Sequence, residues 1–148
     1  MKLGRAQAII IRENKVLFGY GKVGERLGHF FIGGRVEIGE TSSESVLREV
    51  MEELNVKGEI IFELKKEILE DHFTFLIDIC NQECTLGYDP EEDGWEEDKR
   101  SLQKLIWVPL SEKERFTSID KAYFMKLIEA CNERTFNPEW LIQMKQLI

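Results

Sequence analysis

The residues of this sequence best suited to chemistry are three glutamates, Glu49, Glu52 and Glu53. They stand at positions i, i+3 and i+4, so on a helix their carboxylates crowd one side within about one turn. Like charges at this spacing oppose helix formation by roughly 0.2–0.5 kcal/mol per pair. A hard divalent cation with oxygen ligands would offset that repulsion, and Mg²⁺ or Mn²⁺ is the natural candidate. Taken alone, the run would indicate only a solvated helix face, because charge runs usually face water.

Residues on the N-terminal side of these glutamates favour a metal site over a solvated face. Gly33 and Gly34 permit unusual backbone angles and a close approach of main chain to a ligand, and they can aim a carbonyl at the same cation. Arg48 always carries its charge, and it can fork onto Glu40 or pair with Glu52. The fork onto Glu40 would fix the preceding loop against the helix.

Residues 33–56 read GGRVEIGETSSESVLREVMEELNV and resemble the Nudix box, G-x5-E-x7-R-E-U-x-E-E-x-G-U, where U is aliphatic. The box residues matched here are Gly34, Glu40, Arg48, Glu49, Val50, Glu52, Glu53 and Val56. The glycine slot departs, because it holds Asn55. That slot follows the last helical turn and calls for a left-handed residue, for which asparagine is the usual substitute. We therefore expect activity to survive the departure.

The resemblance implies a hydrolase that cleaves nucleoside diphosphates linked to another moiety, with Mg²⁺ or Mn²⁺ as cofactor. In the family's terms, the metal ligands are the Gly33 carbonyl, Glu49, Glu52 and Glu53, and the catalytic residues are Glu40, Arg48, Glu49 and Glu53. Glu40 and Arg48 would orient this group of side chains, while a box glutamate or an acid from a later loop would deprotonate the attacking water.

The substrate stays open among nucleoside triphosphates, ADP-ribose and other sugar nucleotides. The alternative function is a non-catalytic Nudix-fold module that binds a nucleotide and regulates a partner. Such modules typically lose box carboxylates, whereas this chain retains all of them.

The elements that must position the box are strands on either side of a helix. Residues 41–54 read as a helix with a capping box, in which Thr41 or Ser42 caps the first turn and Glu44 lies three residues after Thr41. The expected strands are residues 4–11, 16–20, 29–32, 57–69, 73–80 and 105–108, with residues 13–15 as a hairpin turn and 21–28 as a loop. Further helices are expected at 118–131 and from Asn137-Pro138 onward, with asparagine as N-cap.

This order of elements predicts an α/β fold with a mixed β-sheet between helices. It agrees with the α/β/α sandwich that the resemblance implies. At 148 residues, the chain is expected to form a single domain over residues 1–148, large enough for a full hydrophobic core.

The most acidic segment, residues 87–98, is either a solvated loop or a source of a further carboxylate. The second interpretation comes from the family, where a loop after the central strands often brings an acid to the metals. Glu92, Glu96 and Glu97 are the candidates. Trp95 in the same segment could stack on a base or simply pack locally.

Two further positions are candidate substrate contacts. Phe30 and Phe31 point to opposite faces if both lie in a strand, so one would enter the core while the other lines the cleft. Phe31 is taken as the candidate contact. His72 is interpreted as structural, or as a contact for a substrate phosphate.

Composition limits the partners. The net charge of −8 argues against a general nucleic-acid surface, so a small nucleotide held through metal ions is the expected substrate. The apolar run at residues 6–11 is far shorter than a membrane span and lacks the layout of a signal peptide. Three cysteines without a paired ligand motif indicate reduced thiols and a cytoplasmic protein. The oligomeric state stays open, with a homodimer as one option.

Overall fold

The computed structural model describes residues 4–65 and 68–148. The strands are β1 (Arg5–Ile9), β2 (Ile11–Arg12), β3 (Lys15–Val23), β4 (Arg26–Phe30), β5 (Ile32–Arg35), β6 (Glu59–Glu63), β7 (His72–Asp78) and β8 (Leu102–Pro109). The helices are α1 (Ser42–Leu54), α2 (Ser118–Glu133) and α3 (Leu141–Leu147), and short 3-10 turns lie at Pro90–Glu92, Glu97–Lys99 and Lys113–Arg115.

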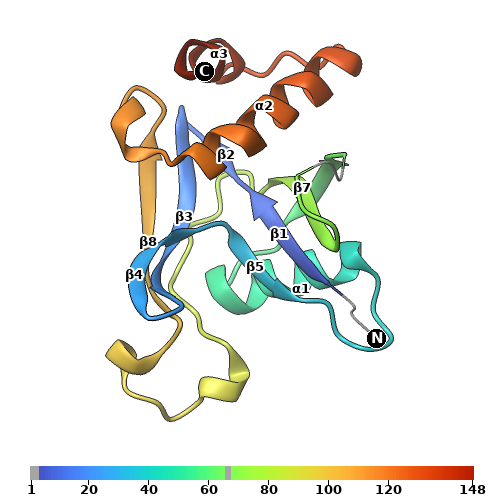
Figure 1. Cartoon of the computed structure of the whole chain (residues 1–148). Helices are drawn as coiled ribbons and strands as arrows, with labels where there is room; N and C mark the ends of the chain where they lie inside the picture. The colour runs from blue at the N-terminus through green and yellow to red at the C-terminus, as the bar shows by residue number, and fades with distance from the viewer. Residues whose placement is uncertain (1–3, 66–67) are drawn as a thin grey trace.

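Within the described residues, the strands form two four-stranded sheets (Figure 1). The first has the order β5-β1-β7-β6 and is mixed, because β1 and β7 are parallel while its other pairs are antiparallel. The second is antiparallel and is built around β3, which pairs with β2, β4 and β8. β6 and β7 form an antiparallel pair where strands 57–69 and 73–80 are expected, and residues 66–67 of the first expected strand lie outside the described residues.

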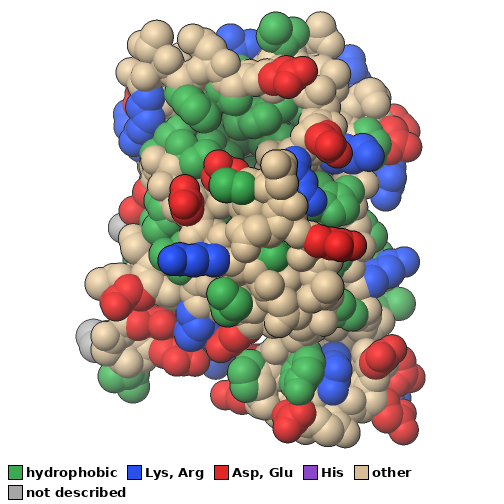
Figure 2. Space-filling view, turned by 180° about the vertical axis from the view of Figure 1, so that it is seen from behind, with side chains coloured by type: hydrophobic (Ala, Val, Ile, Leu, Met, Phe, Trp, Pro, Cys, Tyr) green, Lys and Arg blue, Asp and Glu red, His purple; other side chains and the backbone are tan. Residues whose placement is uncertain are grey.

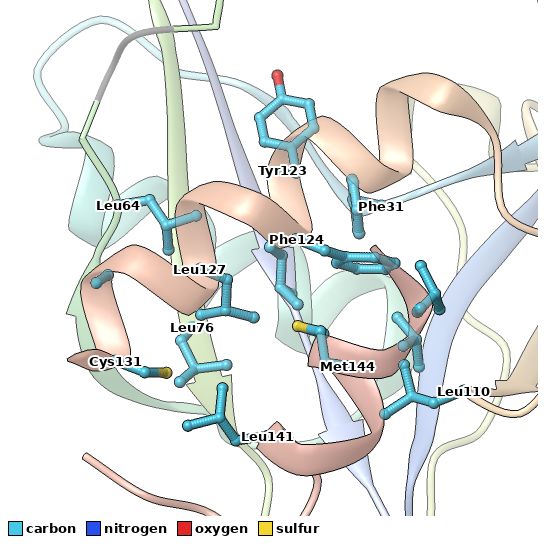
Figure 3. Close-up of a cluster of buried hydrophobic side chains, with 14 of the residues drawn as sticks. Phe31, Leu64, Leu76, Leu110, Tyr123, Phe124, Leu127, Cys131, Leu141 and Met144 are labelled. Carbon is cyan, nitrogen blue, oxygen red and sulfur yellow. The ribbon is translucent and has the colours of Figure 1, made fainter. Parts of the chain in front are cut away.

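Helices cover both faces of the first sheet. Alternate residues of β1 supply the two cores, because successive strand side chains point to opposite faces. Ala6 and Ala8 pack with Val50 of α1 on one face, whereas Ile9 packs with residues of α2 and α3 on the other. Figure 3 shows this second core, where side chains from α2 and α3 converge on Leu76 of β7. The expected α/β sandwich with sheets between helices is confirmed.

Of the expectations about the first strands, one is confirmed and two need correction. The confirmed one is the hairpin at Glu13-Asn14, where both residues have positive φ, as a two-residue turn of this kind requires. The expected strand 4–11 is divided, however, between β1 in one sheet and β2 in the other. The expected loop 21–28 is wrong, because β3 and β4 continue through it to a tight turn at Gly24. Gly21 lies within β3 and allows the Ser101 backbone to approach it closely, since a Cβ at this position would collide with that backbone.

The last helix begins later than expected. Asn137 is not its N-cap, because the backbone N–H of Leu141 bonds to the carbonyl of Pro138 in a turn and α3 begins at Leu141. This start lets Leu141, Met144 and Leu147 face the core together. Across residues 4–65 and 68–148, each helix is too short or too polar to cross a bilayer.

Candidate active site

Helix α1 presents its apolar face to the first sheet and its acidic face to a cleft. The Thr41 side chain accepts the Glu44 N–H and the Glu44 side chain accepts the Thr41 N–H, which confirms the capping box. Val46, Val50 and Leu54 are buried on one side. Asn55 ends the helix at φ 56° and ψ 36°, so the left-handed conformation expected at the departing slot is confirmed.

Glu53 is a buried acid at the base of this site. Its exposure is 6%, and it bonds with the Glu49 carboxylate and with the backbone of Gly33. Burial, followed by the hydrogen bond with Glu49, raises the pKa of the Glu53 carboxyl well above its usual range. Gly34 leaves the room for this arrangement, because a Cβ at that position would collide with the Glu49 carboxylate. The structure thus brings Gly33, Gly34, Glu49 and Glu53 together.

Arg48 joins the remaining acidic residues of the box. Its guanidinium donates to both carboxylate oxygens of Glu40, Nη2 to Oε1 at 2.7 Å and Nε to Oε2 at 3.0 Å. Its Nη1 donates to Glu49 at 3.0 Å and to Glu52 at 3.2 Å. The fork onto Glu40 and the pair with Glu52 are therefore both present. The Nη2 group also donates to the Arg35 carbonyl, which fastens the end of β5 to α1.

This network shifts the pKa values of two of its acids in opposite directions. The hydrogen bond from Arg48 lowers the pKa of Glu40 to about 2. Burial, followed by the charge of Glu49, raises the pKa of Glu52 above its usual range. The site therefore contains carboxylates that interact with one another more strongly than a solvated helix face would allow.

The acidic face of α1 lines a cleft of about 840 Å³. This volume lies within the roughly 300–1,000 Å³ range of small-molecule sites. The cleft is lined by Arg5, Lys22, Val23, Phe30, Gly33, Gly34, Arg35, Val36, Glu37, Ile38, Arg48, Glu49, Glu52, Glu53, Asp89, Pro90, Glu91, Ser101 and Leu102. Seen from behind, acidic side chains gather on both sides of a hollow at the lower edge of the molecule (Figure 2).

The late acidic loop reaches the cleft, but through residues that the sequence did not single out. Asp89 and Glu91 line the cleft, and the charge of Asp89 acts on Glu52. Glu92 lies buried outside it, accepting hydrogen bonds from the backbone and hydroxyl of Ser101 at 3.1 and 2.9 Å. Glu96 and Glu97 are exposed and do not line the cleft.

The candidate aromatic and histidine contacts also lie elsewhere. Phe31 does not line the cleft, because it is buried against Tyr123 and Phe124, as Figure 3 shows, whereas Phe30 lines the cleft. Trp95 is half-exposed and His72 half-buried at the start of β7, both outside the cleft lining.

The cleft lining includes charged residues that the sequence did not single out, among them Lys22, Asp89 and Glu91. Strand alternation by itself left Phe30 and Phe31 as equal candidates. The three charged residues carry no local spacing signal, because strand pairing and loop docking bring them to the cleft.

The donor atoms of the site are oxygens, the type of ligand that a hard divalent cation prefers. Glu49, Glu52 and Glu53 offer carboxylate oxygens beside the Gly33 backbone. Among the residues that the structure describes, no three acidic, histidine or cysteine side chains already converge on one point as ligands. The reason is visible in the contacts, since Arg48 holds Glu49 and Glu52, and Glu53 bonds with Glu49. A cation would compete with Arg48 for these oxygens.

Comparisons with known proteins agree with this geometry. A family model described as NUDIX domain matches residues 2–127. The E. coli ORF135 protein has a solution structure that superposes with a TM-score of 0.59 at 20% identity, covering 94% of this chain and 96% of that one. A C. elegans Ap4A hydrolase superposes with a TM-score of 0.59 at 15% identity, covering 85% and 98%. A UDP-X diphosphatase superposes with a TM-score of 0.54 at 16% identity, covering 99% of this chain and 64% of that one. No curated protein matches. At these identities, the structural likenesses show the fold.

Proposed function

The chain belongs to the Nudix family of hydrolases, and from this premise we propose that it cleaves a P–O–P linkage in a nucleoside diphosphate derivative with the help of Mg²⁺ or Mn²⁺. The observation that carries the proposal is the acidic face of α1 at the base of a ligand-sized cleft. Glu53 is buried there against Glu49, which is costly for two acids unless a cation or a proton compensates.

The charges around the cleft support a metal-assisted reaction. Six carboxylates line the cleft against four cationic side chains, so its own charge would repel a polyphosphate. Bound cations reverse such a balance, because they become the largest positive charges in the site. When bound, Mg²⁺ or Mn²⁺ supplies positive charge to the phosphoryl oxygens and lowers the pKa of a coordinated water.

The chain's own residues have separate tasks in this proposal. Glu49, Glu52, Glu53 and the Gly33 carbonyl hold the metal. Arg48 fixes the position of the site through Glu40, since its two bonds to that carboxylate clamp the β5–α1 connection onto the helix. The group that removes a proton from the attacking water is one of the cleft acids.

Several substrate classes deserve a direct comparison. Nucleoside triphosphates, ADP-ribose and UDP-sugars satisfy the proposed chemistry, and the neighbouring Ap4A hydrolase adds Ap4A to the panel. Each compound would be incubated with the protein and Mg²⁺, Mn²⁺ or EDTA while released phosphate and pyrophosphate are measured. Hydrolysis that requires the metal is expected. No hydrolysis of any compound, together with no divalent-cation binding by calorimetry at millimolar concentration, would overturn the proposal.

The panel also tests the second candidate, a module that binds a nucleotide without cleaving it. Retention of every box carboxylate favours the enzyme, since a binding module has no use for a buried acid pair. Tight binding of a nucleotide with no turnover would favour the module.

A further inference from the structure

Helix α1 and the late acidic loop are fastened together at the point where the sequence departs from the Nudix box. The backbone N–H of Thr85 donates to the Leu54 carbonyl at 3.0 Å, and that of Gly87 donates to the Glu53 carbonyl at 2.8 Å. Carbonyls in the last turn of a helix lack intrahelical partners. The loop therefore completes the C-terminal end of the helix that carries the acidic site.

The side chain of Asn55 adds two bonds to this junction. Its Nδ2 donates to the Thr85 carbonyl at 3.1 Å and to the Thr85 hydroxyl at 3.0 Å. A glycine in the same slot would adopt the left-handed conformation at no cost, but it would have no group to make these bonds. Asn55 thus does more than tolerate an unusual backbone angle.

The backbone of the loop lies directly on the helix just after this junction. A Cβ at Gly87 would collide with the Glu52 carbonyl, so only glycine permits the contact. Two residues later, Asp89 enters the cleft lining, where its charge acts on Glu52. The other end of the loop is held by Glu92 on Ser101.

We propose that Asn55 is a positioning residue that docks the late loop onto the end of α1 and so holds Asp89 and Glu91 at the cleft. The inference rests on the proposed function for the role of the cleft, but the docking itself is independent of it. It gives the non-consensus residue a purpose, because restoring the family's glycine should weaken the enzyme instead of improving it.

The test is the Asn55→Gly variant of the full chain, with Asn14→Gly as the matched control. Asn14 also adopts the left-handed conformation, at φ 60°, but it lies in the β2–β3 turn. Amide hydrogen exchange of the metal-free proteins would be followed for residues 85–92. We expect these amides to exchange about threefold to tenfold faster in Asn55→Gly than in the wild type, the range that one or two modest hydrogen bonds supply. In Asn14→Gly their exchange rates should equal those of the wild type.

Kinetics with the panel substrate that the wild type hydrolyses fastest would follow. We expect kcat/KM to fall about threefold to tenfold in Asn55→Gly while Tm stays near the wild-type value, since glycine suits the cap. Thr85→Val should have a smaller effect, because the Thr85 carbonyl remains, and it should add little to Asn55→Gly because the two residues share one interaction.

The outcomes separate the inference from the proposed function. Unchanged exchange at residues 85–92 in Asn55→Gly would overturn the docking, whatever the activity. Faster exchange with unchanged kcat/KM would overturn the positioning role. If no panel compound is hydrolysed, the proposed function fails, and the exchange measurement still decides whether Asn55 docks the loop.

Discussion

Replacing Glu53 with glutamine separates a metal-binding role from a structural one. The side chain is 6% exposed and its pKa is raised by burial and by the Glu49 carboxylate, so the folded, metal-free protein holds it against a like group. An amide of the same shape keeps the packing, can donate to Glu49, and removes the repulsion. We therefore expect the metal-free Glu53→Gln variant to melt no lower than the wild type.

The effect of metal should be the opposite. A ligand at ten times its dissociation constant stabilises a protein by about 1.4 kcal/mol. For a chain of this size, that shifts Tm by roughly 3–6 °C. Glu53→Gln should lose most of this Mg²⁺-induced shift, and its turnover should fall by about 10²-fold or more, as for other groups that act directly on the reaction.

Differential scanning calorimetry with Mg²⁺ and with EDTA, alongside turnover, measures both effects. Glu44→Gln is the matched control, because it makes the same change of charge on the same helix and glutamine also serves in a capping box. A Glu53→Gln protein that melts well below the wild type with unchanged kinetics would show that Glu53 is structural. Retention of the full Mg²⁺-induced shift would equally refute the reasoning.

Three further predictions concern acids and thiols. The hydrogen bond from Arg48 lowers the pKa of Glu40 from 4.5 to about 2. The ionised Glu40 carboxylate therefore stabilises the fold fully above pH 4.5, and this stabilisation is lost as the pH falls towards 2. The Tm difference between wild type and Glu40→Gln should shrink over that pH range. Asp89→Asn should lower turnover at saturating Mg²⁺ because it removes a cleft charge while keeping the cap of the 3-10 turn, whereas the matched change Glu96→Gln in the exposed part of the loop should leave turnover unchanged. Burial raises the pKa of the Cys131 thiol to about 11, so mass spectrometry after maleimide treatment of the native protein should find Cys80 modified and Cys131 modified only on unfolding.

Each of these has a result that contradicts it. A Tm difference for Glu40→Gln that is independent of pH would mean that the ion pair does not stabilise the fold. Equal turnover in the Asp89 and Glu96 variants would show that the Asp89 carboxylate takes no part in the reaction. Modification of native Cys131 as fast as Cys80 would show that the core beneath α2 opens readily.

The sequence by itself determined the features that depend on neighbours along the chain. The capping box at Thr41, the acidic face at Glu49, Glu52 and Glu53, and the left-handed Asn55 all follow from helical periodicity and local hydrogen bonding within a few residues. The hairpin at Glu13-Asn14 is equally local. The fold class followed from the order of such elements.

The tertiary structure alone decided which residues meet across the chain. Phe31 rather than Phe30 entered the core, because Phe31 lies between β4 and β5, where the chain passes from one sheet to the other, and there it packs against α2. Phe30, at the end of β4, lines the cleft. Tertiary contacts also decided which acids of the late loop reach the cleft and which do not. Glu92 turned to Ser101 while Asp89 and Glu91 reached the cleft, since hydrogen bonds between the loop and the distant end of α1 fix the loop's path. Contacts between residues some 30 positions apart, such as Asn55 and Thr85, leave no periodic signal in the sequence.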